Sequence, residues 1–383
     1  MKRRISVVTG TRSEYGLLRP VLKKINSSKK LDLFLIVAGM HLSKKFGNTI
    51  KEIHDDGFKI YSNVNMVPKG NTTFNMAKAV GTGTIKFAEI FQKLKPDINL
   101  VLGDRDEALS STLAASHMNI PNAHIHGGDR TQAGIDEYNR HAITKLSNIH
   151  FAATHKSKQR IIKMGENPSF VYFVGSPGID EVFSNEISSK KSLENKYCKN
   201  LLGNEILLLY HPVTTESKLS KNQMNEIAAA LIKLKITTIA IAPNSDAGNC
   251  EIFTILKNLS KKYSWLKYYK NIPRSDYLGL LKTCGVLVGN SSSGIIEAGY
   301  FKIPVVNIGI RQKHRERGSN VIDVENILSN NIYKSILKGL KNKENKLLKT
   351  NKIYGNGTSS QKIVKILETI PISEKLINKE IMY

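Results

Sequence analysis

The sequence predicts an α/β protein built from two doubly wound lobes in tandem. Short apolar, β-branched runs alternate with longer amphipathic patterns almost from end to end, as parallel strands alternate with helices. With 383 residues and 40% apolar content, the chain is long enough for two domains that each bury a core. A polar stretch with little pattern, residues 184–205, interrupts the alternation and marks the expected boundary.

The first lobe is expected to contain buried parallel strands with helices between them. Its apolar runs are short, continuous and rich in Val, Ile and Leu, which is typical of strands covered on both faces. The predicted strands span residues 5–10, 31–39, 97–104, 122–128, 149–154 and 170–176, and the predicted helices span residues 14–28, 43–57, 77–95, 106–119 and 139–148.

The second lobe repeats this alternation and is followed by one more amphipathic helix, residues 359–370. Ligands of such sheets bind beyond the carboxyl ends of the strands, so two tandem lobes predict a cleft between them. We expect residues 1–180, joined by the C-terminal helix in 359–383, to form one lobe and residues 181–358 the other. The predicted strands of the second lobe span residues 206–212, 237–244, 265–272, 285–290 and 303–309.

The formal net charge of +25 raises three possible partners: nucleic acid, an anionic membrane surface and acidic small molecules. The sequence has no aromatic interleaving, helix-turn-helix or zinc pattern, so we expect no specific nucleic-acid partner. The favoured interpretation is that the lysines decorate solvated helix faces, with attraction of an anionic substrate second. No apolar run is long enough for a membrane span, and no export signal is visible, so we expect a cytoplasmic protein.

A serine-rich turn in the second lobe predicts a nucleoside-diphosphate site. A strand runs into Asn290, Ser291 and Ser292, and the helix that follows carries Glu297. Hydroxyls and free amides at the start of a helix suit a pyrophosphate, and a carboxylate further along suits the two hydroxyls of a ribose. Arg311, after the next strand, adds positive charge.

Other strand ends carry further polar residues, each with an ordinary structural alternative. Arg12 follows a Gly turn that is either a phosphate-binding turn or an ordinary one, and Asp104 is either functional or a helix N-cap. His211 ends a strand, where we favour a ligand or catalytic role, and Asn244 is otherwise a turn former. The stretch HIHGGDRTQAGIDEYNRH, residues 124–141, concentrates titratable side chains where a strand should lead into a helix.

Nine motifs follow one another along nearly the whole chain: TGTRSEYG, GMHLSKKFGNT, GDRDEAL, HIHGGD, IDEYNRHAITKLS, VGSPGID, HPVTTE, PNSDAG and GNSSSGIIEAGYFKIPVVNIGIRQ. Their order and approximate spacing resemble the hydrolysing UDP-N-acetylglucosamine 2-epimerases of the NeuC type. The resemblance implies a GT-B fold, with two Rossmann-like lobes and the nucleotide held mainly by the C-terminal one. It also implies conversion of UDP-N-acetylglucosamine and water into UDP and N-acetylmannosamine, through elimination to a 2-acetamidoglucal, for sialic acid synthesis.

The same resemblance assigns roles to individual residues. Asp104 and Asp136 match catalytic carboxylates, and His211 matches a residue close to the departing pyrophosphate. His41 and Arg140 match the sugar side of the site. Matches to nucleotide contacts, beside His211, are Arg12, Arg105, Gly175, Ser176, Asn244, Ser291, Ser292, Glu297 and Arg311.

His126 is the position where this chain departs from many relatives, which have a carboxylate there. An imidazole exchanges protons near neutral pH, so we favour a direct catalytic role. The alternatives are a hydrogen-bond partner that positions Asp104 or a sugar hydroxyl, and a purely structural histidine.

Two other functions compete with the leading one. Related enzymes act on 2,4-diacetamido-6-deoxy sugar nucleotides toward legionaminic acid, some with GDP in place of UDP, and sugar identity cannot be read from the motifs. A GT-B glycosyltransferase would also need the serine-rich nucleotide site, although the paired Asp104 and Asp136 motifs argue against it.

We expect no cofactor and no metal site, because the elimination needs no cofactor and the three cysteines lack metal-ligand spacing. The resemblance to the family also implies a homodimer or homotetramer.

Overall fold

The computed structural model describes residues 2–43, 49–68, 72–132, 134–243, 248–349 and 352–382. The chain divides into two compact units. The first consists of Met1–Arg130, Ile135–Phe183 and Tyr354–Tyr383, and the second of Thr131–Gly134 and Ser184–Ile353.

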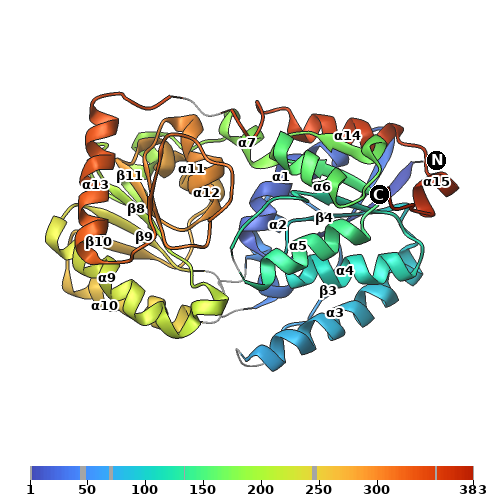
Figure 1. The fold of residues 1–383 in the computed structure, drawn as a ribbon, viewed down its shortest axis with the longest axis horizontal. Helices are drawn as coiled ribbons and strands as arrows, with labels where there is room; N and C mark the ends of the chain where they lie inside the picture. The colour runs from blue at the N-terminus through green and yellow to red at the C-terminus, as the bar shows by residue number, and fades with distance from the viewer. Residues whose placement is uncertain are drawn as a thin grey trace. The chain divides into compact units, whose positions relative to one another are not determined.

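The first unit is a parallel sheet with helices on both faces (Figure 1). Within the described residues it has seven strands in the order β3-β2-β1-β4-β5-β6-β7. The strands are β1 (Arg3–Thr9), β2 (Leu31–Ala38), β3 (Ile60–Val64), β4 (Ile98–Leu102), β5 (Asn122–Ile125), β6 (Ile149–Ala152) and β7 (Val171–Phe173). The α-helices are α1 (Arg12–Asn26), α2 (Ile50–Asp55), α3 (Thr73–Leu94), α4 (Asp106–His117), α5 (Ile135–Leu146), α6 (His155–Lys163), α7 (Pro177–Val182), α14 (Ser359–Thr369) and α15 (Glu374–Ile377).

The strand order of the first unit determines where a ligand is expected. The chain moves outward from β1 through β2 to β3, then returns to the other side of β1 with β4. Ile5 of β1 lies opposite both Leu33 of β2 and Ile98 of β4, so β1 is paired on both sides. Such a reversal leaves a crevice at the carboxyl ends of the two central strands, here β1 and β4.

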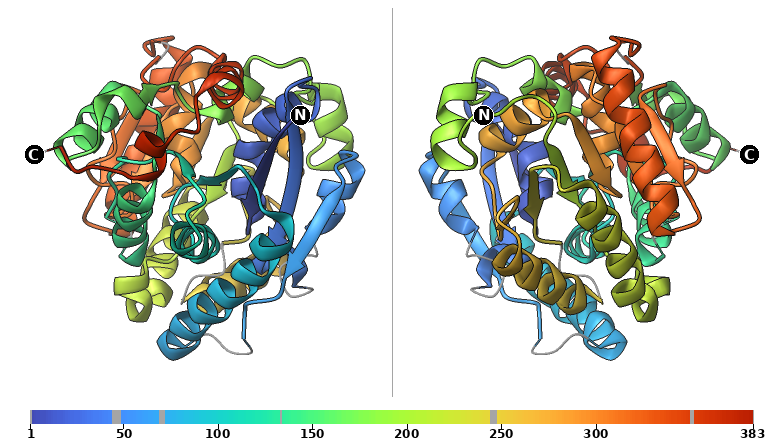
Figure 2. Two further views of the ribbon diagram at one scale, coloured as in Figure 1. Left: turned by 90° about the vertical axis from the view of Figure 1, so that its right-hand side faces the viewer. Right: turned by 90° about the vertical axis from the view of Figure 1, so that its left-hand side faces the viewer.

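The second unit has the same construction (Figure 2). Its described residues form a six-stranded parallel sheet in the order β10-β9-β8-β11-β12-β13, which reverses between β8 and β11. The strands are β8 (Ile206–Leu209), β9 (Thr238–Ile241), β10 (Leu266–Tyr269), β11 (Val286–Gly289), β12 (Val305–Ile308) and β13 (Val321–Val324). The α-helices are α8 (Lys190–Lys196), α9 (Ser220–Leu234), α10 (Asn249–Lys262), α11 (Arg274–Thr283), α12 (Ser292–Ile296) and α13 (Ser329–Glu344).

The C-terminal segment belongs to the first unit. Ile363 and Leu367 of α14 are fully buried in the same apolar core as β1 and α1. The start of α14 is capped by Asp180, whose carboxylate accepts hydrogen bonds from the backbone amides of Ser359 and Ser360 at 2.9 and 2.7 Å. Because the first amides of a helix lack partners within it, this cap fixes the point where the chain returns.

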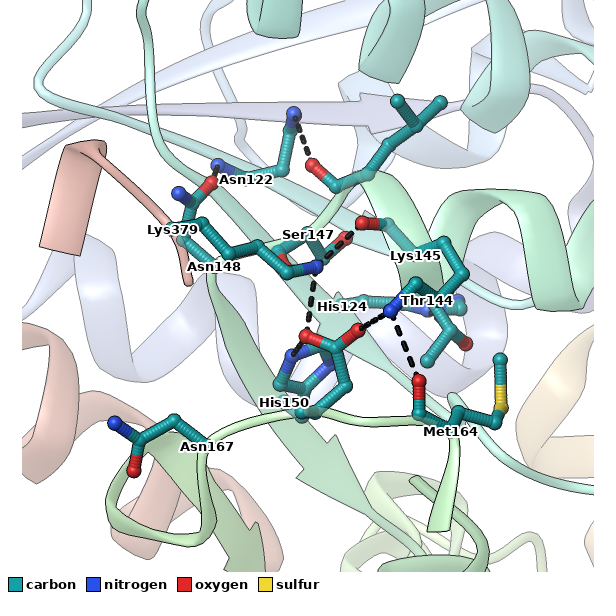
Figure 3. A network of polar contacts seen from close by, with 12 residues as sticks. Asn122, His124, Thr144, Lys145, Ser147, Asn148, His150, Met164, Asn167 and Lys379 are labelled. Atoms are coloured by element: carbon teal, nitrogen blue, oxygen red, sulfur yellow. Dashed lines mark hydrogen bonds and ion pairs between the residues drawn. The ribbon is translucent and has the colours of Figure 1, made fainter. Parts of the chain in front are cut away.

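A buried ion network anchors the end of the chain near the amino end of β6 (Figure 3). Glu166 lies 2.8 Å from Lys145, 2.6 Å from Lys379 and 3.1 Å from Nε2 of His150. Burial alone raises the pKa of Glu166, but the hydrogen bonds from His150 and the two lysines outweigh it and lower the pKa to about 2. A cavity of 230 Å³ lies beside this network, away from the carboxyl ends of the strands, and we assign it no ligand.

The predicted fold class is confirmed, and differences are found at the edges of the sheets and among the helices, including α8 within the stretch 184–205 that the sequence predicts to have little pattern. Strands β3 and β13 are not predicted from the sequence; they are outer strands with partly exposed residues and polar side chains such as Asn63 and Asp323. Edge strands need no continuous apolar run, so they leave a weak signal. The predicted helix at 43–57 is shorter, with α2 beginning at Ile50 and residues 44–48 outside the described part. Among the helices that the structure describes, none has the length and apolar character to cross a membrane.

Candidate active site

A chain of charged side chains crosses the carboxyl ends of β4 and β5 in the first unit. The Arg140 guanidinium, on α5, forms an ion pair with the Asp104 carboxylate, which follows β4. Its other terminal nitrogen lies 3.9 Å from Oδ2 of Asp129, which follows β5. The side chains of Arg140 and Asp129 are each only 3% exposed, whereas that of Asp104 is 19% exposed. Of these three charged side chains, Asp104 is therefore the one that a substrate can reach.

The N-cap alternative for Asp104 does not match the structure. Helix α4 begins at Asp106, and its N-cap residue is Arg105, which makes no side-chain capping bond. The Asp104 carboxylate points instead to Arg140, so it is held by an ion pair and not by the helix that follows.

His126 is the next member of this series of polar contacts, after Asp104, Arg140 and Asp129. Its Nδ1 lies 2.9 Å from Oδ2 of Asp129, and its Nε2 lies 2.9 Å from the Ser176 hydroxyl. Because a carboxylate accepts only, Nδ1 carries hydrogen, and in the neutral ring Nε2 accepts from Ser176. Ser157 also donates to Asp129, at 2.7 Å. Both ring nitrogens of His126 thus have partners within the protein.

The backbone at His126 is unusual. Its φ is 65°, in the left-handed region that few residues other than glycine adopt, with asparagine, aspartate and histidine the most frequent among them. Its amide donates to the Phe151 carbonyl at 3.1 Å, and its side chain is only 5% exposed. The surrounding contacts hold this conformation, as is common for residues at functional sites.

Asp136 and Arg140 lie on one face of α5. Both belong to that helix, four residues apart, and both are buried at 7% and 2% exposure. Residues at this spacing are neighbours on a helix, so Asp136 adds a second carboxyl group on the face that carries Arg140. The adjacent Asn139 donates to Asp106 at 3.0 Å and ties α5 to the start of α4.

His124 has a structural role beneath this site. Its Nε2 donates to the carbonyl of Gly103 at 2.8 Å, directly before Asp104. Burial lowers the pKa of His124 to about 3, against the hydrogen bond to Gly103, which raises it. His124 is therefore neutral and holds the backbone that presents Asp104.

We predict that His124 makes the protein less stable in acid. An unfolded chain protonates this histidine near 6.5, whereas the folded protein does so only near 3. The contribution of neutral His124 to the free energy of unfolding is therefore complete above pH 6.5 and is lost as the pH falls toward 3. His124→Gln keeps a donor for Gly103 but cannot titrate, so between pH 7 and 4.5 it should lose about 2–3 kcal/mol less unfolding free energy than the parent. Urea unfolding at both pH values measures this, and equal losses in the two proteins would contradict it.

Two predicted residues of the first unit lie at the end of β1 and β2. Arg12 begins α1, and its Nε lies 3.0 Å from the Glu52 carboxylate. His41 follows β2, is fully buried, and contacts the hydroxyls of Thr9 and Thr49 at 3.2 and 2.8 Å. Burial lowers the pKa of His41 to about 4, so it is neutral and bound inside the protein. A sugar contact by His41 remains a prediction.

In the second unit, Asn290 joins the ends of β8 and β11. Its side-chain oxygen accepts from the backbone amide of His211 at 2.7 Å, and its side-chain nitrogen donates to the carbonyl of His211 at 2.8 Å. Its own carbonyl accepts from Arg311 at 3.3 Å and from Gln312 at 3.0 Å. Asn290 therefore places His211 and Arg311, which come from two separate motifs, beside the serine-rich turn.

The serine-rich turn opens α12. Ser291 is the N-cap residue, and its hydroxyl accepts from the amide of Ser293 at 3.4 Å. Glu297, for which the sequence predicts a ribose contact, is 1% exposed and paired with Arg274 at 2.5 and 3.1 Å. Ser293 also donates to it, at 2.5 Å. The ribose contact remains a prediction, and Arg274 is a partner that the motifs do not indicate.

The remaining predicted residues are less informative. Arg105 lies with its Nε 4.0 Å from Glu107, and Ser292 is the first residue of α12. Gly175 and Ser176 lie in the first unit, where the amide of Ser176 donates to the Tyr354 carbonyl at 2.8 Å. Asn244 lies outside the described residues. In the part of the chain that the structure describes, no group of three or more His, Cys, Asp or Glu could hold a metal ion.

Comparison of the sequence with known protein families identifies the family of this chain. A sequence model described as UDP-N-acetylglucosamine 2-epimerase matches residues 23–368. The chain belongs to the UDP-N-acetylglucosamine 2-epimerase family. The resemblance seen in the nine motifs is thereby confirmed, and the glycosyltransferase alternative loses its support.

Three relatives in this epimerase family show the range of substrates. A UDP-N,N'-diacetylbacillosamine 2-epimerase (hydrolyzing) from Legionella pneumophila is 40% identical over 380 residues, 99% of each chain. A GDP/UDP-N,N'-diacetylbacillosamine 2-epimerase (hydrolyzing) from Campylobacter jejuni is 36% identical, with 85% of each chain covered. A UDP-N-acetylglucosamine 2-epimerase from Neisseria meningitidis is 33% identical, with 84% of each chain covered.

Solved structures of epimerases in this family show the same fold. That of UDP-GlcNAc 2-epimerase from Neisseria meningitidis, bound to UDP-GlcNAc, has a TM-score of 0.80 at 19% identity and covers 95% of this chain and 99% of its own. One from Methanocaldococcus jannaschii, in complex with UDP-GlcNAc and UDP, has a TM-score of 0.76 at 21% identity, with 95% and 99% covered. The expected GT-B arrangement of two Rossmann-like lobes is therefore the fold of this protein.

Proposed function

We propose that the protein is a hydrolysing 2-epimerase of a nucleotide-linked acetamido sugar. The observation that carries this proposal is Asp104, a partly exposed carboxylate at the end of a buried ion chain in a member of this epimerase family. The favoured substrate is UDP-N,N'-diacetylbacillosamine, because relatives described as acting on it match this chain at 40% and 36% identity. UDP-N-acetylglucosamine, the substrate that the nine motifs favour, is the second candidate, supported by the Neisseria relative.

The chemistry needs two proton-handling groups. The C2 proton of the sugar is removed as the nucleotide leaves C1, which forms a C1–C2 double bond. Water then adds to C1, and a proton returns to C2 from the opposite face, which releases the C2 epimer of the sugar. We assign the two transfers to Asp104 and Asp136, since a positioned carboxyl group can take or return a proton.

The second unit is proposed to bind the nucleotide. Ser291 and Ser292 begin α12, where free backbone amides suit a diphosphate, and Arg311 adds positive charge. His211 is proposed to stabilise or protonate the leaving diphosphate. The two hydrogen bonds between its backbone and the Asn290 side chain, which fix its position, support that role. No metal or cofactor enters the scheme.

His126 is proposed to act as a positioning residue. Among the three roles that the sequence allows, the geometry favours this one because both ring nitrogens are already bound by Asp129 and Ser176. The imidazole orients Asp129, which faces Arg140, and Arg140 holds Asp104. Direct proton transfer by His126 to the sugar remains the alternative.

We predict that His126→Gln keeps more activity than His126→Ala. A glutamine amide can donate to Asp129, whereas alanine leaves that buried carboxylate with one partner fewer. If His126 only positions Asp129, His126→Ala should lower kcat about tenfold and His126→Gln by less, with KM nearly unchanged. If His126 transfers the proton itself, both variants should lose about 10²- to 10⁴-fold in kcat. Steady-state kinetics of the three proteins separates the two roles.

Two measurements test the proposed function. Turnover in D2O should release free nucleotide and a sugar labelled with deuterium at C2, and an unlabelled sugar would contradict the elimination. A panel of UDP-N,N'-diacetylbacillosamine, its GDP counterpart and UDP-N-acetylglucosamine should show the highest kcat/KM for the first. If the protein released nucleotide from none of these three substrates, the proposal would be refuted.

A further inference from the structure

Polar side chains of two helices of the second unit meet at the Glu297 carboxylate. The two terminal nitrogens of Arg274 donate to its two oxygens, at 2.5 and 3.1 Å. Ser293 donates to Oε2 of Glu297 at 2.5 Å and itself accepts from the Tyr277 hydroxyl at 2.6 Å. Arg274 and Tyr277 belong to α11, whereas Ser293 lies in α12 and Glu297 is its C-cap residue. We call these four residues the Arg274 cluster.

The two charged members of the Arg274 cluster differ in what a ligand can reach. The side chain of Glu297 is 2% exposed, whereas that of Arg274 is 15% exposed. A carboxylate buried to this extent needs donors at its oxygens, and here both oxygens of Glu297 accept hydrogen bonds within the protein. Arg274 is therefore the charged group of the cluster that a ligand can contact.

Arg274 lies where the helix itself disfavours its charge. It is the first residue of α11, and the start of a helix carries a partial positive charge. The ion pair with Glu297 offsets this cost, but helix formation does not call for an arginine at this position. A residue that breaks a local preference is a candidate for function.

The Arg274 cluster adjoins the proposed diphosphate site. Ser293 directly follows Ser292, which begins α12 and is proposed to bind the diphosphate. The amide of Glu297 donates to the carbonyl of Ser293 at 2.8 Å, so Glu297 lies about one helical turn, or about 5 Å, further along. Of the two groups joined to the diphosphate, the sugar is assigned to Asp104 in the first unit. The ribose is therefore the group that remains for Arg274.

We propose that Arg274 is a nucleotide-binding residue that donates to a hydroxyl oxygen of the ribose, and that Glu297 positions its guanidinium for this contact. The inference rests on the proposed function, in which the second unit binds the nucleotide. A guanidinium has five N–H groups in a fixed planar arrangement, so it can pair with a carboxylate and also donate to a further acceptor. A ribose hydroxyl is an uncharged acceptor, which suits a cation whose charge Glu297 already balances.

Deoxyribose analogues of UDP test this contact by calorimetry, without turnover. The parent should bind either 2′-deoxy-UDP or 3′-deoxy-UDP about tenfold more weakly than UDP, as expected for loss of a hydrogen bond to a charged group. Arg274→Met should bind that analogue and UDP equally well. Glu297→Gln can still accept from Arg274, so it should keep part of the preference, about threefold or more.

Two further variants complete the test. Lys282→Met removes an exposed cation from the last turn of α11 and should keep the full preference for UDP. Arg274→Met/Glu297→Gln leaves no unpaired buried carboxylate, so it carries the test if Arg274→Met does not fold, and it too should show no preference.

The outcomes separate Arg274 from Glu297 as the ribose contact. A preference for UDP that survives without Arg274, or that disappears in Glu297→Gln, would overturn the inference, because Glu297 would then meet the ribose itself. Equal binding of UDP and both analogues by the parent, or no binding of UDP, would overturn it as well. If the preference followed Arg274 but no sugar nucleotide were turned over, only the proposed function would fail, so the two failures are distinguishable.

Discussion

Asp104→Asn is expected to lower kcat by about 10²- to 10⁴-fold, the usual range for loss of a group that transfers a proton. The asparagine amide has nearly the same shape as the carboxylate and can still accept from Arg140, so the fold should be retained. It cannot take a proton from C2 of the sugar. Inhibition by UDP should change by less than about twofold, because the nucleotide is assigned to the second unit.

Asp106→Asn provides the matched control for this substitution. Asp106 lies two residues further along, at the start of α4, and its carboxylate accepts from Asn139 at 3.0 Å. It is outside the ion chain that holds Asp104, so its asparagine variant should keep kcat within about threefold of the parent. Equal losses in the two variants, or a normal kcat for Asp104→Asn, would show that Asp104 does not transfer the proton.

The fold could be predicted from the sequence because its central strands are covered on both faces. In β4, all five residues from Ile98 to Leu102 are buried, and a short apolar run of this kind is typical of an enclosed parallel strand. The strands β3 and β13 could not be predicted in the same way, since most of their residues are partly or fully exposed and they include polar side chains such as Asn63 and Asp323.

The candidate site could be predicted in part, because its motifs mark residues but not their partners. Asp104, Asp136 and Arg140 come from recognisable motifs, whereas the ion pair between Asp104 and Arg140 joins residues from two elements. Asp129 is not among the predicted residues, although a carboxylate directly after two glycines at a strand end is a signal that could have found it. Its importance comes from its contacts with His126 and Arg140, which only the folded chain shows.

Glu14 shows that a local signal does not reveal a residue's surroundings in the fold. Thr11 is the N-cap of α1 and accepts from the amide of Glu14 at 3.3 Å, while Glu14 reaches back to Gly10. The spacing of Thr11 and Glu14 is that of a capping box, which the sequence already contains. In the fold Glu14 is 4% exposed, and no pattern near it encodes this burial.

Arg140→Met is expected to cost about 3–5 kcal/mol of unfolding free energy and to abolish measurable turnover. Methionine has the volume to fill the site but leaves Asp104 and Asp129 without their shared cation. The cost falls mainly on Asp129, whose side chain is 3% exposed, because a buried carboxylate that loses a nearby cation is left with an uncompensated charge. Urea unfolding and nucleotide release measure the two effects separately.

The double variant Arg140→Met/Asp129→Asn distinguishes stability from catalysis. Asparagine removes the buried charge, so about half or more of the lost unfolding free energy should return. Turnover should not return, since Asp104 still lacks the guanidinium that holds it. Recovery of both would mean that Arg140 serves only to neutralise Asp129, whereas recovery of stability alone would show that it also positions Asp104, the carboxylate proposed to transfer the proton.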